Sequence, residues 1–256
     1  MRFFKYFYRW LKDHPLKEGT ILIDTYQIKE ILGMGSYGIA YLSMDLSEKR
    51  LCVIKQLRQS RRGSKKEREQ FASEIELMKK LHHPLVPRYL DDFTDDGNHY
   101  YVMSYVEGEN LEELLFHEGK QFSEKEALLI IRDIAKIVDY LHEQEIFHCD
   151  LRIPNIVLGK DKHVYLIDFG LAIHNKFQQK KETLKTDDYF DLGDMLLYLL
   201  YSTYKPARKK ALPWTEELVM QEATKDLLKR LLGIEKRFQN GVQVQNSIDM
   251  AIKQQG

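Results

Sequence analysis

The sequence predicts an α+β fold in which a strand-rich N-terminal part with one helix precedes a mainly helical C-terminal part. Between about Tyr26 and Tyr105, short apolar stretches alternate with polar residues, which is the pattern of β-strands. From Asn110 onward, apolar residues recur with the 3.6-residue period of helices. The chain has 256 residues, more than a minimal single domain needs, so two lobes around a cleft would fit.

In the N-terminal part, alternation and capping residues indicate the individual elements. Strands are expected over residues 26–32, 40–44 and 51–55. Ser64 followed by Glu67 is a capping-box pattern, which predicts a helix that runs from there to about Leu81. Pro84 ends this helix, because the residue before a proline avoids helical backbone angles.

In the C-terminal part, three helices are expected. Ser123 with Glu126 caps a long helix, and its apolar side chains share one face: Leu128, Leu129, Ile131, Ile134, Ile137, Val138 and Leu141. A second, strongly apolar helix runs over residues 191–201, and a third over residues 218–232. A site formed by both parts would lie where the strands give way to the helices.

Composition narrows the class of protein. Lys and Arg together number 39, as do Asp and Glu, so charge gives no reason to expect a nucleic-acid partner, and none is expected. Two cysteines, Cys52 and Cys149, are too few for a disulfide framework and fit a reducing cytoplasm. No stretch approaches the roughly 18 apolar residues of a membrane span, and the first residues lack the apolar core of a signal peptide. We therefore expect a cytoplasmic protein.

The most informative motif is a group of polar residues in the middle of the chain. Asp150 is followed five residues later by Asn155, and Asp168 comes thirteen residues after that, just beyond an expected strand. Phosphoryl transfer from ATP needs a carboxylate that orients the attacking hydroxyl, which Asp150 would supply. It also needs oxygen ligands for Mg²⁺, which Asn155 and Asp168 would supply. Arg152 would contact the transferred phosphoryl group, where charge develops in the transition state.

A glycine-rich loop precedes this group in the chain. It runs between two expected strands and consists of Gly33, Met34, Gly35, Ser36, Tyr37 and Gly38. Glycines let a backbone lie close over a triphosphate, because no Cβ stands in the way. A dinucleotide-binding loop would be followed by a helix, whereas a strand is expected here. A glycine-rich hairpin without a ligand is the alternative, because this motif alone is weakly specific.

A lysine and a glutamate complete the set. Lys55 ends an apolar strand, and Glu74 lies in the middle of the helix that follows. A lysine that reaches ATP phosphates is best placed by a carboxylate partner, for which Glu74 is the candidate. Glu76 lies on another face of the helix, so we do not expect it to be that partner. Taken singly, each is more commonly a solvated charge; their order and spacing together favour the functional interpretation.

Taken together, these motifs resemble those of the protein kinases, and the chain is most similar to small soluble bacterial Hanks-type, or eukaryotic-like, Ser/Thr kinases. The resemblance runs from about Asp24 to about Ile252. It implies a bilobal fold with an antiparallel sheet and one helix in the N-lobe. It also implies that Met103 is the gatekeeper and that Ser104 to Val106 form the hinge that binds adenine. The resemblance further implies that the adenine base is sandwiched by Ala40, Val53 and Val157. It implies an apolar spine made of Met78, Tyr89, His148 and Phe169. It also implies that Asp188 anchors the catalytic loop.

Three departures from the family pattern bear on regulation and on substrates. Cys149 stands where an arginine usually makes activity depend on a phosphate in the activation loop, so we expect no such switch. Arg152 replaces the usual lysine, and the two differ in shape at a phosphate. The Ala-Pro-Glu motif is missing, which puts the docking of peptide substrates in doubt. Arg237 matches the arginine that would pair with the missing glutamate, for which Glu182 is a candidate substitute.

Two threonines and a cysteine are candidates for covalent modification. Thr183 and Thr186 lie in a basic segment and are candidate autophosphorylation sites, although a mobile, solvated loop is the favoured interpretation. Cys149 beside Asp150 could sense oxidants, but an inert small side chain is favoured because a reactive thiol needs an electropositive setting.

Residues 1–23 form an N-terminal arm. In a helix over residues 2–12, one broad face carries Phe3, Phe4, Tyr6, Phe7, Tyr8, Trp10 and Leu11, and the other carries Arg2, Lys5, Arg9 and Lys12. Such a helix could lie peripherally on the inner face of the membrane or dock on the protein's own surface, which is slightly favoured because the arm is short. The N-lobe with its hinge is expected over residues 24–105, and the C-lobe, with a shortened activation segment, over residues 106–256.

The sequence thus predicts a Ser/Thr protein kinase that uses ATP and Mg²⁺, or Mn²⁺ in its place, phosphorylates proteins and autophosphorylates. A small-molecule kinase is one alternative and would explain the missing peptide platform. A pseudokinase scaffold is the other, but Lys55, Asp150, Asn155 and Asp168 are all retained, which argues against it.

Overall fold

The computed structural model describes residues 13–35, 38–175, 178–205 and 212–255. The chain divides into two compact units, and the boundary falls between Val106 and Glu107. Among the described residues, no helix is both long enough and apolar enough to cross a membrane. The expected α+β class is confirmed, with the antiparallel sheet in the first unit and most helices in the second.

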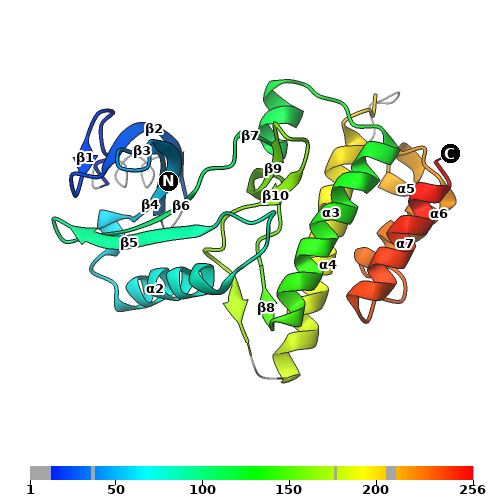
Figure 1. The fold of residues 1–256 in the computed structure, drawn as a ribbon. Coiled ribbons are helices and arrows are strands. Elements are labelled where there is room, and N and C mark those ends of the chain that lie inside the picture. Colours follow the sequence, from blue (N-terminus) through cyan, green and yellow to red (C-terminus); the bar gives the residue numbers. More distant parts are fainter. Residues whose placement is uncertain (1–12, 36–37, 176–177, 206–211, 256) are drawn as a thin grey trace. The chain divides into compact units, whose positions relative to one another are not determined.

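The first unit is built on a six-stranded antiparallel sheet (Figure 1). Its strands lie in the order β1-β2-β3-β4-β6-β5, and each pairs with its neighbour in the antiparallel sense. The alternation of apolar residues places Ile28, Tyr41 and Ile54 in one buried cluster with Tyr100. The strands span Ile21–Leu22 (β1), Tyr26–Met34 (β2), Gly38–Asp45 (β3), Arg50–Leu57 (β4), Tyr89–Asp95 (β5) and Asn98–Ser104 (β6).

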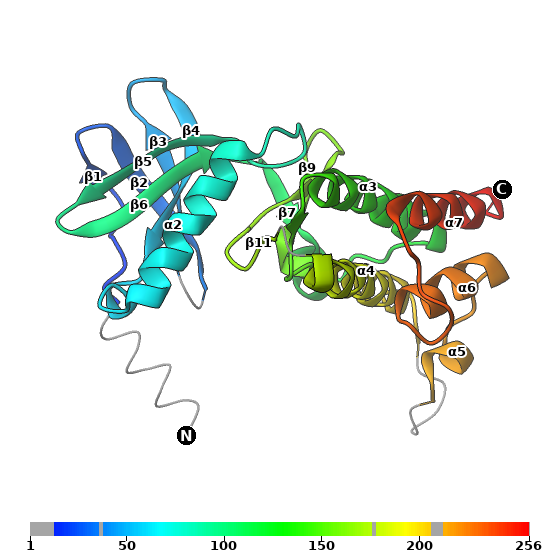
Figure 2. The same cartoon turned by 90° about the horizontal axis from the view of Figure 1, so that it is seen from below.

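One long helix, α2 (Lys65–Lys80), crosses this sheet (Figure 2). The hydroxyl of Ser64 accepts a hydrogen bond from the backbone N–H of Glu67, so the expected cap is present. A short 3₁₀ turn, η1 (Gln59–Arg61), connects β4 to the helix. The buried side of α2 includes Phe71, Glu74, Leu77 and Met78, so a carboxylate is buried among apolar residues on this face.

Part of the expected N-terminal arm packs on the first unit. The Asp13 carboxylate is almost fully buried, Leu16 packs against the core cluster, and Leu22 belongs to it. The backbone N–H of Gly19 donates to the carbonyl of Ile28, which fixes the segment against β2. Residues 13–23 therefore belong structurally to the first unit, whereas the helix expected over residues 2–12 lies outside the described residues.

The second unit is mainly helical. Helix α3 (Glu124–Glu143) packs against α4 (Gln178–Tyr201) and α7 (Gly241–Lys253), while α6 (Glu222–Leu231) packs against α4 and α7. The capping box of Ser123 and Glu126 is present at the start of α3. The remaining elements are short: β7 (Gly108–Asn110), η2 (Glu113–His117), β8 (Ile146–Phe147), η3 (Ile153–Asn155), β9 (Ile156–Gly159), β10 (Val164–Leu166), β11 (Ile173–His174) and α5 (Trp214–Glu217).

Helix α4 begins much earlier than the sequence predicts. The apolar pattern indicated a start at Asp191, but the helix begins at Gln178. Its first three turns are rich in Gln, Lys and Glu, which favour helix without marking an apolar face. Thr183 and Thr186 consequently lie in a helix, and the loop expected around them is not observed.

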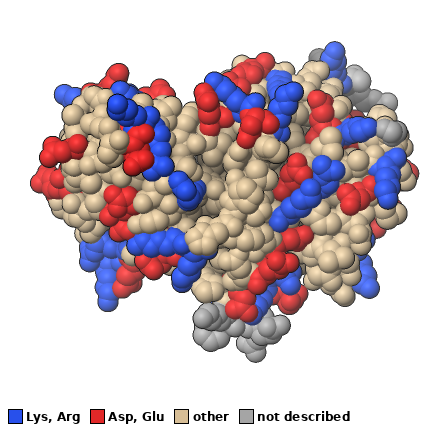
Figure 3. All heavy atoms as spheres, in the orientation of Figure 1, with Lys and Arg blue, Asp and Glu red and all other residues tan. Residues whose placement is uncertain are grey.

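Charged side chains of both signs are mixed on the face drawn in Figure 3. On the face drawn in Figure 3, acidic and basic residues lie in small neighbouring groups without a broad field of one sign. This agrees with equal totals of 39 basic and 39 acidic residues. On this face, surface charge therefore gives no broad site for a highly charged partner.

Candidate active site

Lys55 and Glu74 meet in the interior of the first unit. The Nζ of Lys55 lies 2.6 Å from Oε1 of Glu74, and both residues are less than a tenth exposed. The same oxygen accepts a hydrogen bond from the Tyr101 hydroxyl at 2.8 Å. The register explains this meeting, since Lys55 on β4 lies directly opposite Tyr101 on β6. Glu76 is exposed and pairs with Lys79 instead.

The glycine-rich loop joins β2 to β3, as the sequence predicts. The N–H of Gly35 donates to the carbonyl of Gly38 and closes the turn, while Ser36 and Tyr37 lie outside the described residues. A Cβ on Gly38 would approach the side chain of Lys55 to 3.2 Å and the carbonyl of Gln56 to 3.0 Å. The third glycine thus allows the loop and the lysine to lie close together.

In the second unit, a loop between β8 and β9 carries Asp150, Arg152 and Asn155. The Nδ2 of Asn155 donates to the backbone carbonyl of Asp150 at 2.9 Å and to its Oδ2 at 3.1 Å. Arg152 is more exposed, and its Nε is 4.0 Å from the Asp150 carboxylate. The amide nitrogen of Asn155 therefore holds Asp150 in place, and the amide oxygen is left for another ligand.

Asp168 follows β10 and has a left-handed backbone, with φ of 61°. Such angles are uncommon outside glycine and asparagine and often occur at functional sites. The N–H of Ile167 donates to the carbonyl of Asn155, which ties the two expected metal ligands together through the backbone. Beside them, Phe169 packs edge-on against His148, with ring centroids 5.0 Å apart.

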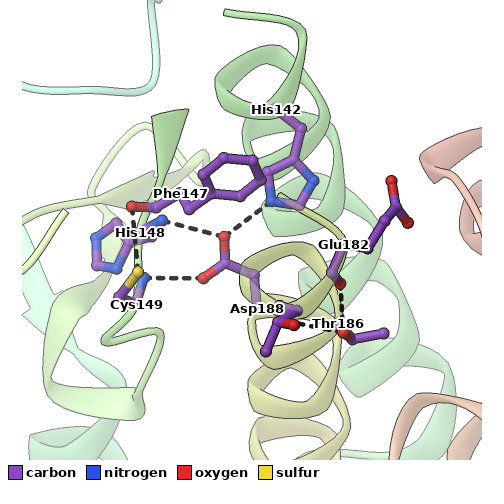
Figure 4. A network of polar contacts seen from close by, with 8 residues as sticks. His142, Phe147, His148, Cys149, Glu182, Thr186 and Asp188 are labelled. Carbon is purple, nitrogen blue, oxygen red and sulfur yellow. Dashed lines mark hydrogen bonds and ion pairs between the residues drawn. The ribbon is translucent and has the colours of Figure 1, made fainter. Parts of the chain in front are cut away.

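Asp188 on α4 organises the loop that carries Asp150 (Figure 4). Its fully buried carboxylate accepts hydrogen bonds from the backbone N–H groups of His148 and Cys149, at 3.0 and 2.8 Å. The Nε2 of His142, on α3, lies 2.8 Å from Oδ2 of the same residue. Cys149 has a φ of 61°, so these bonds hold the backbone in an unfavourable conformation.

The residues expected to surround adenine lie in both units. In the first unit, Met103 on β6 lies directly opposite Val53 on β4. Ala40 on β3 lies directly opposite Lys55 on β4. The N–H of Ser104 donates to the carbonyl of Arg88, so the start of the expected hinge is fixed to the turn before β5. Val106 is the last residue of the first unit, and Val157 lies on β9 in the second.

Comparison with known proteins identifies the family. The model of the protein kinase domain matches residues 26–196, which is more than half of the chain. The chain belongs to the protein kinase family. It is 46% identical over 245 residues to the probable serine/threonine-protein kinase YbdM of Bacillus subtilis, with 95% of each chain covered. It is 34% identical to serine/threonine-protein kinase B of Synechocystis over 158 residues, which are 59% of this chain and 27% of that protein.

A solved structure supports the fold. The kinase domain of PknI from Mycobacterium tuberculosis superposes with a TM-score of 0.71 at 21% identity, covering 93% of this chain and all of that one. This match confirms the prediction of the kinase fold. The family match and the 46% identity to YbdM confirm the prediction of a Ser/Thr protein kinase. As a member of this family, the protein phosphorylates proteins with ATP.

Sequence reasoning missed two residues that form hydrogen bonds to site residues, namely Tyr101 and His142. Tyr101 lies two residues before Met103 on the same strand, so period-two alternation places both on one face; this signal was available. His142 lies near the end of α3, 46 residues from its partner Asp188. Sequence spacing gives no sign of this contact, which depends on how α3 packs against α4.

The departures of this kinase from the family pattern have visible structural counterparts. Burial and the neighbouring carboxylates, Asp188 first among them, raise the pKa of the Cys149 thiol to about 12, which agrees with an inert side chain. Glu182 forms an ion pair with Lys185 at 3.6 Å, and among the described residues it forms none with Arg237. The ion pair that the sequence suggests between Glu182 and Arg237 is therefore not observed among the described residues.

Proposed function

We propose that this kinase divides the catalytic work between named residues of its two units. Lys55, positioned by Glu74, binds the phosphates of ATP, and the loop of residues 33–38 covers them. Asp150 orients the hydroxyl of the substrate, and Arg152 offsets charge on the transferred group. The buried ion pair of Lys55 and Glu74 carries this proposal. Burying two charges costs free energy of desolvation, and a role in binding phosphate explains why the pair is nevertheless present.

ATP and Mg²⁺, or Mn²⁺ in its place, are the proposed cofactors. The described residues contain no group of three or more His, Cys, Asp or Glu side chains that could hold a metal by themselves. That suits Mg²⁺, which is commonly held by one or two protein oxygens together with waters and substrate phosphates. Asn155 and Asp168 offer those oxygens, and the bound cation would neutralise charge on the phosphates. Adenine would lie against Ala40, Val53 and Val157, beside Met103 and the hinge from Ser104 to Val106.

The physiological substrate is proposed to be a protein, and autophosphorylation is included. Thr183 and Thr186 are the candidate sites, although the Thr186 hydroxyl donates to the helix carbonyl of Thr183 at 2.9 Å. Modification of Thr186 would therefore require this turn of α4 to open. One observation favours a small molecule as the acceptor instead: α4 begins ten residues after Asp168, which leaves little chain for a peptide platform.

The first experiment combines purified full-length protein, γ-labelled ATP, Mg²⁺ and myelin basic protein, alongside the Asp150→Asn variant. Label on either protein should fall by about a hundredfold or more in the variant, because Asp150 acts on the reacting hydroxyl. If ATP is turned over without labelling of protein, and this turnover is lost in the variant, the function would instead be that of a small-molecule kinase. Equal labelling by both proteins would overturn the role of Asp150, and no turnover in either would favour a pseudokinase.

Location and membrane contact are proposed from weaker observations. Both cysteines are free, and Cys52 is buried, which suits a reducing cytoplasm. Peripheral membrane contact through residues 2–12 stays a prediction based on their aromatic and basic faces. Equal pelleting of intact and arm-deleted protein with anionic liposomes would contradict it.

A further inference from the structure

A groove opens on the first unit between α2, the end of β4 and strands β5 and β6. Figure 2 shows how α2 lies across this sheet. Its volume is about 530 Å³, within the range of ligand-binding clefts. Apolar lining comes from the helix and from the strands: Leu57, Phe71, Ala72, Ile75, Phe93 and Tyr100. Exposed charges of both signs also line it, namely Lys65, Arg68, Glu69 and Asp92. Glu69 already pairs with Lys65 and Asp92 with Lys79, so the lining chiefly suits a partner with aromatic side chains.

The N-terminal arm starts from a fixed point next to this groove. The Asp13 carboxylate is buried and lies 3.3 Å from Nε of Arg58, and it accepts hydrogen bonds from the N–H and the hydroxyl of Ser60. Arg58 directly follows Leu57, which lines the groove. Asp13 is therefore held against the segment that directly follows Leu57, and residues 1–12 join the chain at that point.

Those twelve residues have the chemistry that the groove suits. Residues 3–11 carry seven apolar side chains, six of them aromatic, and four basic residues lie at positions 2, 5, 9 and 12. Twelve residues span roughly 18 Å as a helix, which is about the length of three turns of α2. Each buried aromatic ring contributes about 150–250 Å² of contact, so a few of these rings would supply a substantial apolar interface.

We propose that residues 1–12 dock in this groove of their own chain. The aromatic side chains lie against Phe71, Ala72 and Ile75, and the cations Lys65 and Arg68 lie over their rings. Tethering by Asp13 favours the arm of the same chain, because it raises the local concentration of this occupant to the millimolar range typical of short linkers.

A docked arm would affect Lys55 through a short series of contacts between neighbouring side chains. Phe71, which lines the groove, packs against Tyr101 with ring centroids 5.6 Å apart. The Tyr101 hydroxyl donates to Glu74, which holds Lys55. A docked arm therefore supports the helix that positions the ATP-binding lysine. This consequence rests on the proposed function, whereas the docking itself does not.

Photocrosslinking of the full-length protein tests the docking. With p-benzoylphenylalanine in place of Phe7 and without ATP, we expect a crosslink within one chain to residues 65–75 or 93–100, located by mass spectrometry. The probe in place of Lys5, on the basic face, should give much less. Since the readout needs no catalysis, a failure here is distinct from a failure of kinase activity.

Matched variants on α2 make the test specific. Ala72→Arg places bulk in the groove and should lower the crosslinked fraction about fivefold or more. Ser73→Arg, at the exposed neighbouring position outside the groove lining, should leave it unchanged. Thermal melts of both variants establish that they fold. A parallel assay should show lower kcat for Ala72→Arg and unchanged kcat for Ser73→Arg.

Other crosslinking results would overturn the proposal. A product between two chains would assign the groove to the arm of a second copy. A product with lipid in the presence of anionic vesicles, and none with the groove, would assign the arm to the membrane. Equal crosslinking by Ala72→Arg and the parent protein, or crosslinks only outside the groove, would mean that the groove does not bind the arm.

Discussion

At the scale of single residues, Oε1 of Glu74 accepts two hydrogen bonds in the interior of the first unit. It accepts bonds from both Lys55 and Tyr101 at less than 3 Å. A buried carboxylate is stabilised only when charge and hydrogen bonds compensate for its lost hydration. The tyrosine supplies a second, neutral donor, so the orientation of the carboxylate does not depend on the lysine alone.

Tyr101→Phe is expected to weaken this arrangement without removing any apolar contact. A hydrogen bond to a charged group contributes roughly 1.5 kcal/mol, which corresponds to about a tenfold lower kcat/KM for ATP. Steady-state kinetics measure the change. Tyr100→Phe is the matched control, because that hydroxyl accepts from Gln56 and makes no contact with Glu74. Equal losses in both variants would show that the effect is general to the core.

The residues differ in how well the sequence could predict them. Lys55 and Glu74 were predicted to pair because a strand lysine and a helix glutamate occur in a recognisable order, and the structure brings them together. Tyr101 could have been found from alternation with Met103. His142 could not, since its contact with Asp188 joins two helices whose relative packing is not encoded by local spacing.

At the scale of elements, α4 is the segment in which sequence and structure differ most. The helix begins at Gln178, and its first turns carry charges without an apolar stripe, so hydrophobic periodicity could not detect them. Farther along, the same helix holds Asp188 and Asp191 on neighbouring turns of the buried side. Burial first, and then Asp188, raise the pKa of Asp191 to about 7.

This shift makes the stability of α4 depend on pH. An aspartate ordinarily titrates near pH 3.9, so the folded state binds the proton more tightly than the unfolded state. The contribution of the tighter proton binding to the free energy of unfolding is therefore complete below about pH 4 and is lost as the pH rises toward 7. Asp191→Asn keeps an oxygen acceptor and removes the charge. We expect Tm to rise by roughly 3 °C at pH 8, for about 1 kcal/mol, and by less at pH 5.

Differential scanning calorimetry at both pH values measures this effect. Asp187→Asn is a suitable control, because Asp187 is exposed on the same helix. A Tm increase for Asp191→Asn that is the same at pH 5 and pH 8 would show that the gain does not come from the charge.

At the scale of the whole molecule, the general architecture could be predicted because it depends on repeated patterns. Strand alternation, the caps at Ser64 and Ser123, and long apolar helices each report on several residues at once. The structure divides between Val106 and Glu107, and the lobe bounds of 24–105 and 106–256 stay a prediction. By contrast, the packing of residues 13–23 on the sheet depends on Asp13, a single polar residue that gave no signal of burial.

The carboxylate of Asp188 has a consequence for motion. It binds the amide hydrogens of His148 and Cys149 in a fully buried position, although the loop has no regular secondary structure there. Amide hydrogens exchange with solvent only when such bonds open, and core bonds open only with large parts of the fold. In heavy water, these two amides should therefore exchange as slowly as those in the middle of α3, and far more slowly than exposed turns. The loop that carries Asp150 behaves, on this timescale, as part of the core.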